Sequence, residues 1–277
     1  MAGIVRSITM ARLGEASSRG KLMKIVTWNV NSVRSREARL LEWLAANEPD
    51  VLCLQELKLE DALFPHAAIE ALGYKAVTHG QKTYNGVAIL AKEPILDVQR
   101  GLDDGVDDPQ ARLIAATVRG VRVVCVYVPN GSTPTDDKFA YKLQWYQRLR
   151  QWFEREGDAN RAMVLCGDMN VAPEDRDVCR PQDWNHTVLC VPEARAALQQ
   201  VADWGLEDAF RRHRPEAGLY SWWDYRAGGF ERNHGLRIDH VLATKVLPSL
   251  DAFVDRNERR GDKPSDHVPL GVVFDVA

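Results

Sequence analysis

The sequence has 277 residues, of which 45% are hydrophobic, 27% charged and 8% aromatic, with 19 glycines and 13 prolines. These proportions exclude a disordered chain, a collagen-like chain and a small disulfide scaffold, and the length is sufficient to bury a core without metal or disulfide support. The 36 Lys and Arg residues against 39 Asp and Glu give a formal net charge of −3, so a polyanion could bind only at a local positive patch.

The first 22 residues carry four basic side chains and one acidic side chain, Glu15, without the continuous apolar segment of a secretory signal. We expect a disordered extension here and no organelle targeting by residues 1–22. Alternating apolar patterns begin at Met23, and no linker or low-complexity tract follows. The sequence therefore predicts one domain over residues 23–277.

Short apolar runs alternate with helical patterns after Met23, which is typical of a layered α/β domain. Most of the predicted strands are apolar throughout, as expected when both faces of a sheet are covered. The predicted strands are residues 24–29, 51–55, 86–91, 112–118, 121–127, 162–167, 219–223, 237–243 and 268–274.

Apolar residues at helical spacing predict helices over residues 36–47 and 138–155, with two more near 64–72 and 193–203. Segment 179–192 has few periodic signals, and we expect a surface loop there. No stretch approaches the roughly 18 uncharged apolar residues of a membrane-spanning helix, so we expect a soluble protein without a membrane partner.

The cysteines are odd in number, and their spacing fits no metal-ligand motif. We therefore expect reduced residues of the protein core, in a reducing compartment. The five cysteines are Cys53, Cys125, Cys166, Cys179 and Cys190.

Carboxylates, amides and hydroxyls repeatedly follow the apolar strands. Strand ends at one rim of a sheet are where side chains from distant parts of the chain converge on a ligand, so we expect a single site. The polar residues at predicted strand ends are Asn29, Asn31, Glu56, Tyr127, Asn130, Asp168, Asn170, Asp239, Asp266 and His267.

This set of side chains predicts phosphoryl hydrolysis. Oxygen ligands with almost no thiolate or imidazole suit Mg²⁺ or Mn²⁺ better than zinc. An acid beside a histidine, with amides and a phenol, fits the attack of water on a phosphodiester. Each residue alone has another interpretation: Asn29 and Asn31 as turn formers, Glu56 as a solvent-exposed acid, and Tyr127 and Trp222 as core residues. Because so many of these residues occur together at strand ends, a functional site is the favoured interpretation.

Eight sequence blocks make the chain similar to a known family. It resembles the exonuclease III class of apurinic/apyrimidinic endonucleases, within the endonuclease/exonuclease/phosphatase superfamily, over residues 23–276. The blocks are WNVNSVR (28–34), LCLQELK (52–58), YNGVAIL (84–90), VYVPNG (126–131), GDMNVAPEDRDV (167–178), SWWDYR (221–226), GLRIDHVLA (235–243) and KPSDHVPL (263–270). The resemblance implies a four-layer α/β sandwich of the DNase I-like type, with two packed mixed β-sheets flanked by helices.

The resemblance implies Mg²⁺ as the cofactor, with Mn²⁺ able to substitute. Glu56 is then the principal metal ligand, assisted by Asn31 and Asp266. Many relatives carry Asp at the position of Asn31. The metal group also includes Asp168 and Asn170.

The same resemblance assigns catalytic roles. Asn29, Asp168 and Asn170 surround the attacking water and the phosphate, and Asp168 positions or deprotonates the water. Tyr127 contacts the phosphate. His267 binds a non-bridging phosphate oxygen, while the neighbouring Asp239 orients its ring and favours its protonated form.

For DNA binding, the resemblance implies that Trp222 and Leu236 enclose a base-less sugar, which leaves the helix at lower cost than an intact nucleotide. Backbone contacts are expected from positively charged and polar side chains, including the basic run that leads into the SDH motif. These candidates are Lys82, Tyr84, Arg112, Asn130, Arg256, Arg259, Arg260 and Lys263.

The leading hypothesis is a Mg²⁺-dependent DNA-repair nuclease of base excision repair. It would hydrolyse the phosphodiester 5′ to an abasic site and carry 3′–5′ exodeoxyribonuclease and 3′-phosphodiesterase activity. We expect a cytoplasmic, nucleoid-associated monomer whose partner is double-stranded DNA with abasic sites or 3′-blocked ends. The alternatives are a phosphodiesterase acting on RNA 3′ ends or a phospholipid head group, and a non-catalytic nucleic-acid-binding relative.

Overall fold

The apolar strands assemble into two six-stranded mixed sheets. The computed structural model describes residues 21–276, and in it the first sheet has the strand order β11-β12-β1-β2-β4-β3. β1 and β2 are parallel, and the other neighbours in this sheet are antiparallel. Its strands are β1 (Lys21–Asn29), β2 (Val51–Gln55), β3 (Lys75–His79), β4 (Val87–Ala91), β11 (Ser249–Val254) and β12 (Leu270–Val276).

The second sheet has the order β5-β6-β7-β8-β10-β9. It too contains one parallel pair, β7 with β8, among antiparallel neighbours. Its strands are β5 (Leu96–Arg100), β6 (Leu113–Val118), β7 (Val121–Tyr127), β8 (Met163–Asp168), β9 (Leu206–Asp208) and β10 (Asp239–Thr244).

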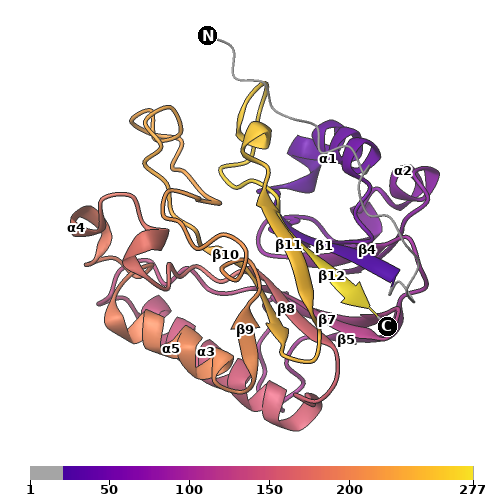
Figure 1. The fold of residues 1–277 in the computed structure, drawn as a ribbon, viewed down its shortest axis with the longest axis horizontal. Coiled ribbons are helices and arrows are strands. Elements are labelled where there is room, and N and C mark those ends of the chain that lie inside the picture. Colours follow the sequence, from indigo (N-terminus) through magenta and orange to yellow (C-terminus); the bar gives the residue numbers. More distant parts are fainter. Residues whose placement is uncertain (1–20, 277) are drawn as a thin grey trace.

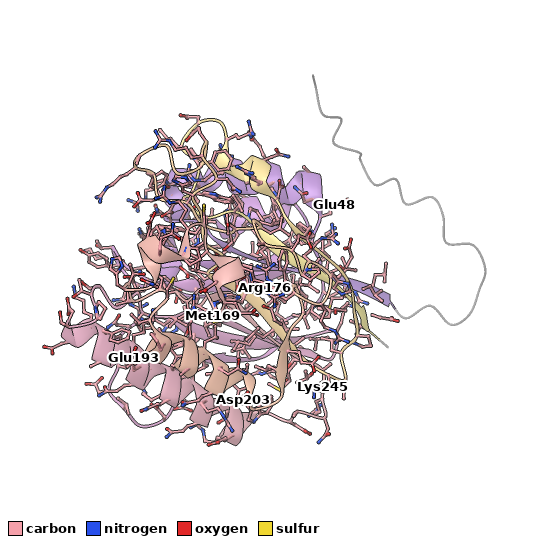
Figure 2. All side chains as sticks on the ribbon, turned by 60° about the vertical axis from the view of Figure 1, so that its left-hand side comes forward. Glu48, Met169, Arg176, Glu193, Asp203 and Lys245 are labelled. Atoms are coloured by element: carbon pink, nitrogen blue, oxygen red, sulfur yellow. The ribbon has the colours of Figure 1, made fainter. Side chains whose placement is uncertain are left out.

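Helices cover the outer faces of the two sheets (Figure 1). α1 (Val33–Asn47) and α2 (His66–Ala71) lie on one side, and α3 (Asp137–Glu156) and α5 (Pro192–Ala202) lie on the other. Figure 2 shows this separation through Glu48, the C-cap of α1, and through Glu193 in the first turn and Asp203 at the C-cap of α5. The short elements are α4 (Pro181–Trp184) and the 3-10 turns η1 (Asp61–Leu63), η2 (Asp175–Asp177) and η3 (Arg256–Arg259).

The strands are apolar throughout because both of their faces are buried. Side chains of one parity, such as Ile25 and Val123, fill the layer between the sheets. Side chains of the other parity pack under the helices, Leu52 against α1 and Leu165 against α3 and α5. Alternate residues of a strand point to opposite faces, so each strand contributes to two layers of the core. This arrangement confirms the predicted α/β sandwich.

The structure corrects the strand prediction at two places. β1 begins at Lys21, and Leu22 pairs with Asp275, so residues 21 and 22 belong to the sheet and not to the predicted extension. Residues 1–20 lie outside the described part of the chain. The segment 219–223 is not a strand, because it forms only isolated bridges from Trp222 to Leu236 and to His267.

Segment 179–192 is also different from the predicted surface loop. It contains α4, and its residues 188–191 are buried against the cluster under the second sheet. The backbone amide of Ala172 donates to the carbonyl of Leu189 at 2.8 Å, so the segment supports the loop that follows β8. All five cysteines are free, but Cys179 is only partly buried and is not a core residue. No helix within residues 21–276 is long and apolar enough to cross a membrane.

Candidate active site

Strand register places the polar strand ends of each sheet side by side. In the first sheet Asn29 pairs with Gln55, so Asn29 lies next to Glu56. In the second sheet Asp168 pairs with Tyr127 on one side and with Asp239 on the other. The two rows lie at the same end of the sandwich, where side chains from both sheets meet.

Asn29 connects the two sheets. Its side-chain amide donates to Glu56 Oε1 at 2.8 Å and to Asp168 Oδ2 at 3.0 Å. Its oxygen accepts a bond from the backbone amide of Asn31 at 2.9 Å. Asn29 is completely buried, and Asp168 is 1% exposed. One amide therefore fixes two carboxylates from different sheets.

His267 completes this row from the loop before β12. Its Nδ1 lies 2.8 Å from Asp239 Oδ2, and its Nε2 lies 3.7 Å from Asp168 Oδ2. Burial opposes the charged imidazolium, but the carboxylates of Asp239 and Asp168 outweigh it and raise the pKa of His267 to about 10. The imidazolium is therefore the form present at neutral pH.

For Asp168, the effect of burial on the pKa is larger than the effect of the neighbouring opposite charge. Burial disfavours its charged form, and this effect exceeds the attraction of His267, so the pKa of Asp168 rises to about 7. Its Oδ1 accepts a bond from the backbone amide of Asn170 at 2.9 Å. A carboxylate with a pKa close to neutrality is suited to take a proton from water.

Two side-chain nitrogens donate to the Asp266 carboxylate. Its Oδ1 accepts from the Asn31 amide at 2.9 Å and its Oδ2 from Trp222 Nε1 at 3.0 Å. Burial alone would raise the pKa of Asp266, but His267 and these two donors lower it. The carboxylate therefore stays charged beside the imidazolium.

Lys58 contributes a cation that the sequence analysis did not assign. Its ammonium lies 2.8 Å from Glu56 Oε2 and donates to Asn31 Oδ1 at 2.6 Å. Asn31, Glu56 and Lys58 all have positive φ angles between 45° and 54°, which turn the backbone sharply after β1 and β2. The only sequence signal was the position of Lys58 two residues after Glu56.

The donor set fits a hard divalent cation. Oxygens of Glu56 and Asn31 already converge on the Lys58 ammonium, which shows that they are arranged around a positive charge. Carboxylate oxygens of Glu56 and Asp168 lie within 4.8 Å of one another. Carboxylate and amide oxygens are the ligands that Mg²⁺ and Mn²⁺ prefer.

Tyr127 and Asn170 close the second-sheet side of the site. The Arg112 guanidinium lies 4.8 Å from the centre of the Tyr127 ring and donates to the Tyr127 carbonyl at 3.1 Å. Burial, with Glu56 and Asp168 nearby, raises the pKa of Tyr127, so its phenol remains a donor. Asn170 Oδ1 accepts from the Asn130 amide at 3.0 Å.

Lys142 is a second residue that the sequence analysis missed. Its ammonium, on the buried face of α3, donates to the carbonyls of Asn130, Asn170 and Val188 at 3.0, 2.7 and 2.7 Å. Burial lowers the pKa of Lys142 to about 7. The available signal was its helical spacing with Tyr146, which put a lysine on the apolar stripe of the helix.

The predicted DNA-contacting residues surround this end of the sandwich. Trp222 is half-buried, with its ring 6.5 Å from the His267 ring and 5.7 Å from that of Trp184. Leu236 exchanges backbone hydrogen bonds with Trp222, but its side chain is completely buried in the core. Trp184, from the segment predicted as a loop, is partly buried and packs edge-on against Trp222.

Of the remaining candidates, Lys82, Tyr84 and Lys263 lie on loops, whereas Arg256 and Arg259 lie in η3. Lys82 and Tyr84 are exposed in the segment before β4, which starts beside Gln55 and therefore at the active-site end. Lys263 is exposed three residues before Asp266.

Comparisons with known proteins agree with this geometry. A model of the endonuclease/exonuclease/phosphatase family matches residues 26–267. The chain is 38% identical over 266 residues to exodeoxyribonuclease III of Haemophilus influenzae, covering 91% of this chain and 100% of the relative.

Two solved structures extend the comparison. An AP endonuclease from Archaeoglobus fulgidus has 42% identity and a TM-score of 0.89, with 92% of this chain and 100% of that chain covered. The 3′ phosphatase NExo from Neisseria, bound to a product DNA hairpin, has 44% identity and a TM-score of 0.89, with 91% and 99% covered. These likenesses span nearly the whole length of each protein.

Proposed function

The chain belongs to the endonuclease/exonuclease/phosphatase family, and we propose that it is a Mg²⁺-dependent DNA-repair nuclease that hydrolyses the phosphodiester 5′ to an abasic site. We include 3′–5′ exonuclease and 3′-phosphodiesterase activity in the proposal. The relatives named above are an exodeoxyribonuclease, an AP endonuclease and a 3′ phosphatase, and the three activities share attack on a phosphate ester.

The observation that carries the proposal is the amide of Asn29, which holds Glu56 and Asp168 together across the two sheets. The Glu56 carboxylate, which would bind the metal, and the Asp168 carboxylate, which would accept the proton, therefore face the same space, next to the His267 imidazolium. A bound Mg²⁺ would supply a Lewis acid that neutralises charge on the phosphate. Glu56 would hold it, with Asn31 and Asp266 as the next oxygen donors.

The remaining catalytic roles belong to protein side chains. Asp168 orients the attacking water and accepts its proton, for which its pKa of about 7 is suited. His267 donates from Nε2 to a non-bridging phosphate oxygen and stabilises the charge that develops there. Asp239 holds the imidazolium from the other side through Nδ1.

Tyr127 and the two asparagines complete the phosphate site. The Tyr127 phenol, kept protonated by burial, donates to the phosphate. Asn130 and Asn170 are bonded to each other, and Lys142 fixes the carbonyls of both. The phosphate would therefore meet donors that are already in position, which lowers the reorganisation needed during the reaction.

Double-stranded DNA with an abasic site or a blocked 3′ end is the proposed substrate, with Trp222 against the base-less sugar and Lys82, Tyr84, Arg112 and Lys263 along the backbone. We propose that one copy of the chain, folded as one domain, is sufficient, because the metal and phosphate donors named here all come from a single chain. The substrate would place the protein at the nucleoid.

The test is cleavage of a duplex that carries one tetrahydrofuran abasic analogue, with Mg²⁺ and with EDTA. Intact duplex with a recessed 3′ end, a 3′-phosphate duplex, RNA and phospholipid micelles serve as competing substrates. We expect Mg²⁺-dependent incision 5′ to the analogue and loss of about 10²–10³-fold in rate for Glu56→Gln.

Glu154→Gln, on the exposed side of α3, is the matched control and should cleave like the parent. Equal rates for the parent and Glu56→Gln, or no incision at the analogue, would overturn the proposal. Preferential cleavage of RNA or phospholipid would show that the same chemistry acts on a substrate other than abasic DNA.

A further inference from the structure

A depression of about 580 Å³ lies outside the active site described above. It is lined by Phe230, Arg256, Arg259 and Arg260, together with Glu231, Gly261 and Pro264. Phe230 comes from the loop over residues 222–236, and the arginines come from η3 and the residue after it. Figure 1 shows these two loops projecting from the same side of the molecule, the orange one before β10 and the yellow one between β11 and β12.

The three arginines, here called the arginine cluster, converge on one aromatic ring. The guanidinium carbons of Arg256, Arg259 and Arg260 lie 4.9, 5.7 and 5.6 Å from the centre of the Phe230 ring. Arg259 also lies 4.6 Å from the centre of the Tyr225 ring. Stacking on aromatic faces fixes the planes of guanidinium groups.

The arginine cluster has no carboxylate partner. Within residues 21–276, no Asp or Glu oxygen forms an ion pair with any of its members, whereas other arginines are paired, for example Arg39 with Glu258 and Arg148 with Asp104. Glu231, the one acidic residue that lines the depression, is exposed and forms no ion pair with the cluster.

Other nearby acids are occupied or exposed. Asp255 accepts from the indole nitrogen of Trp43 at 3.0 Å and from the amide of Asn257, and Asp262 is exposed. The segment 256–263 contains four basic and two acidic residues. Positive charge is therefore concentrated at the depression in a chain of net negative charge.

Arg259 lacks a counter-charge and a partner for one of its donors. It is 8% exposed, its Nη2 donates to the carbonyl of Trp223 at 3.3 Å, and its buried Nε has no partner. Arg256 likewise bonds only a carbonyl, that of Phe230, at 3.2 Å. A buried charge without a counter-charge is unfavourable, and an anion brought from outside would remove that penalty.

We propose that the arginine cluster binds one backbone phosphate of the duplex DNA on which the active site acts. Guanidinium forks bind the oxygens of a phosphate in a bidentate geometry, and the phosphodiester is the anion that DNA carries. The cluster is linked to the active site through the chain. Pro264, which lines the depression, lies two residues before Asp266, and Trp223, whose ring centre is 5.6 Å from the Arg256 guanidinium, follows Trp222. The proposal rests on DNA being the substrate of the enzyme, and it adds a contact to the duplex outside the cleavage site.

The first experiment measures binding of an intact fluorescent duplex by anisotropy in EDTA, from 50 to 200 mM salt. The test variant is Arg256→Gln with Arg260→Gln, because both side chains are exposed and their loss should leave the fold unchanged. We expect binding about tenfold weaker at 100 mM salt. The slope of log K against log salt should fall by about 1 for the lost phosphate.

The control variant carries the same change in charge at the opposite end of the sandwich. Lys92 follows β4, which ends beside Val51 at the start of β2, and Lys245 (Figure 2) follows the end of β10 that lies beside the start of β8. Lys92→Gln with Lys245→Gln should retain the binding and the salt slope of the parent. Equal behaviour of the test and control variants would overturn the proposal.

A second experiment asks whether one phosphate is bound. Single methylphosphonate linkages, which lack the negative charge, are placed at successive positions of a duplex in EDTA, in which one tetrahydrofuran analogue fixes the register of the bound protein. In the parent, one position should weaken binding about tenfold, and in the Arg256→Gln, Arg260→Gln variant that position should have no further effect. If the loss of affinity in the parent were spread evenly over all positions, a phosphate site would be contradicted. The cluster would then act only through a general electrostatic attraction to DNA.

These outcomes are separate from the cleavage test. Failure to cut an abasic duplex would overturn the proposed function, and binding of intact duplex would still report on the arginine cluster. Thermal unfolding of the test variant at the parent temperature would show that its weaker binding comes from the lost charges.

Discussion

Asp239 accepts a hydrogen bond from His267 Nδ1 at 2.8 Å through Oδ2, while its Oδ1 is buried without a hydrogen-bond partner. The carboxylate therefore acts almost entirely on the imidazole. It fixes which nitrogen faces the substrate and supplies the counter-charge that keeps the ring protonated.

Replacing Asp239 by Asn should lower the activity and change its pH dependence. The amide keeps the shape but removes the largest favourable interaction of the imidazolium, so the pKa of His267 falls. We expect about 10²–10³-fold lower kcat at pH 8, with part of the loss recovered at lower pH where the ring is protonated. The measurement is the pH–rate profile beside Asp251→Asn, a change on β11 that should leave the profile of the parent unaltered.

The stability contributed by His267 should depend on pH. Its folded pKa of about 10 lies above the ordinary value of 6.5, so its contribution is fully present below about pH 6.5 and is lost as the pH rises towards 10. Urea unfolding of the parent and His267→Asn should give free energies of unfolding that converge over this window.

Lys142 titrates in the same window with the opposite sign, because its folded pKa of about 7 lies below 10.5. Comparison with the His267 variant isolates the histidine, since Lys142 is present in both proteins. A difference in stability that stayed constant from pH 6.5 to 10 would contradict a raised pKa of His267.

Lys142→Met should weaken both the fold and the catalytic step. The change leaves the carbonyls of Asn130, Asn170 and Val188 without their shared donor. We expect the free energy of unfolding to fall by about 2 kcal/mol and kcat to fall more than KM rises, because the two asparagine loops lose their fixed position. Lys138→Met, on the exposed first turn of α3, should leave both quantities close to those of the parent.

Lys58→Met should reduce the Mg²⁺ concentration needed for half-maximal activity. The Lys58 ammonium contacts the same oxygens of Glu56 and Asn31 that would hold the ion, and its charge opposes a second cation. We expect about tenfold tighter Mg²⁺ binding, measured by calorimetry without DNA as well as by activity. Weaker binding would show instead that Lys58 is needed to position Glu56; Lys92→Met controls for the general loss of charge.

Trp222→Ala should affect abasic DNA more than intact DNA. The indole lies beside the His267 ring, and its Nε1 also bonds Asp266. Trp222→Phe separates the two roles, since it keeps an aromatic surface and removes the donor. We expect an increase of about tenfold in KM for the abasic duplex with alanine and a smaller one with phenylalanine; equal effects on both duplexes would argue against a sugar pocket.

The sequence predicted the central strands and missed the edges. The four strands without a prediction, β3, β5, β9 and β11, are the outer strands of the two sheets. An edge strand is partly exposed and mixes polar with apolar residues, as in Leu96–Arg100 with Asp97 and Gln99, so it lacks the continuous apolar run of a buried strand. The segment 219–223 was wrongly predicted as a strand for the opposite reason: its aromatic residues are apolar, but it forms only isolated bridges, to Leu236 and to His267.

The sequence by itself determined the central strands, the covering helices and the polar residues at strand ends, because buried strands must be apolar and a break to Asn, Asp or Glu is visible locally. Only the tertiary structure decided what contacts what. Asn29 meets Asp168 across 139 positions of the chain, Lys142 reaches three loops, and the arginine cluster forms on Phe230. Such contacts depend on the register and packing of two sheets, which no local pattern of residues records.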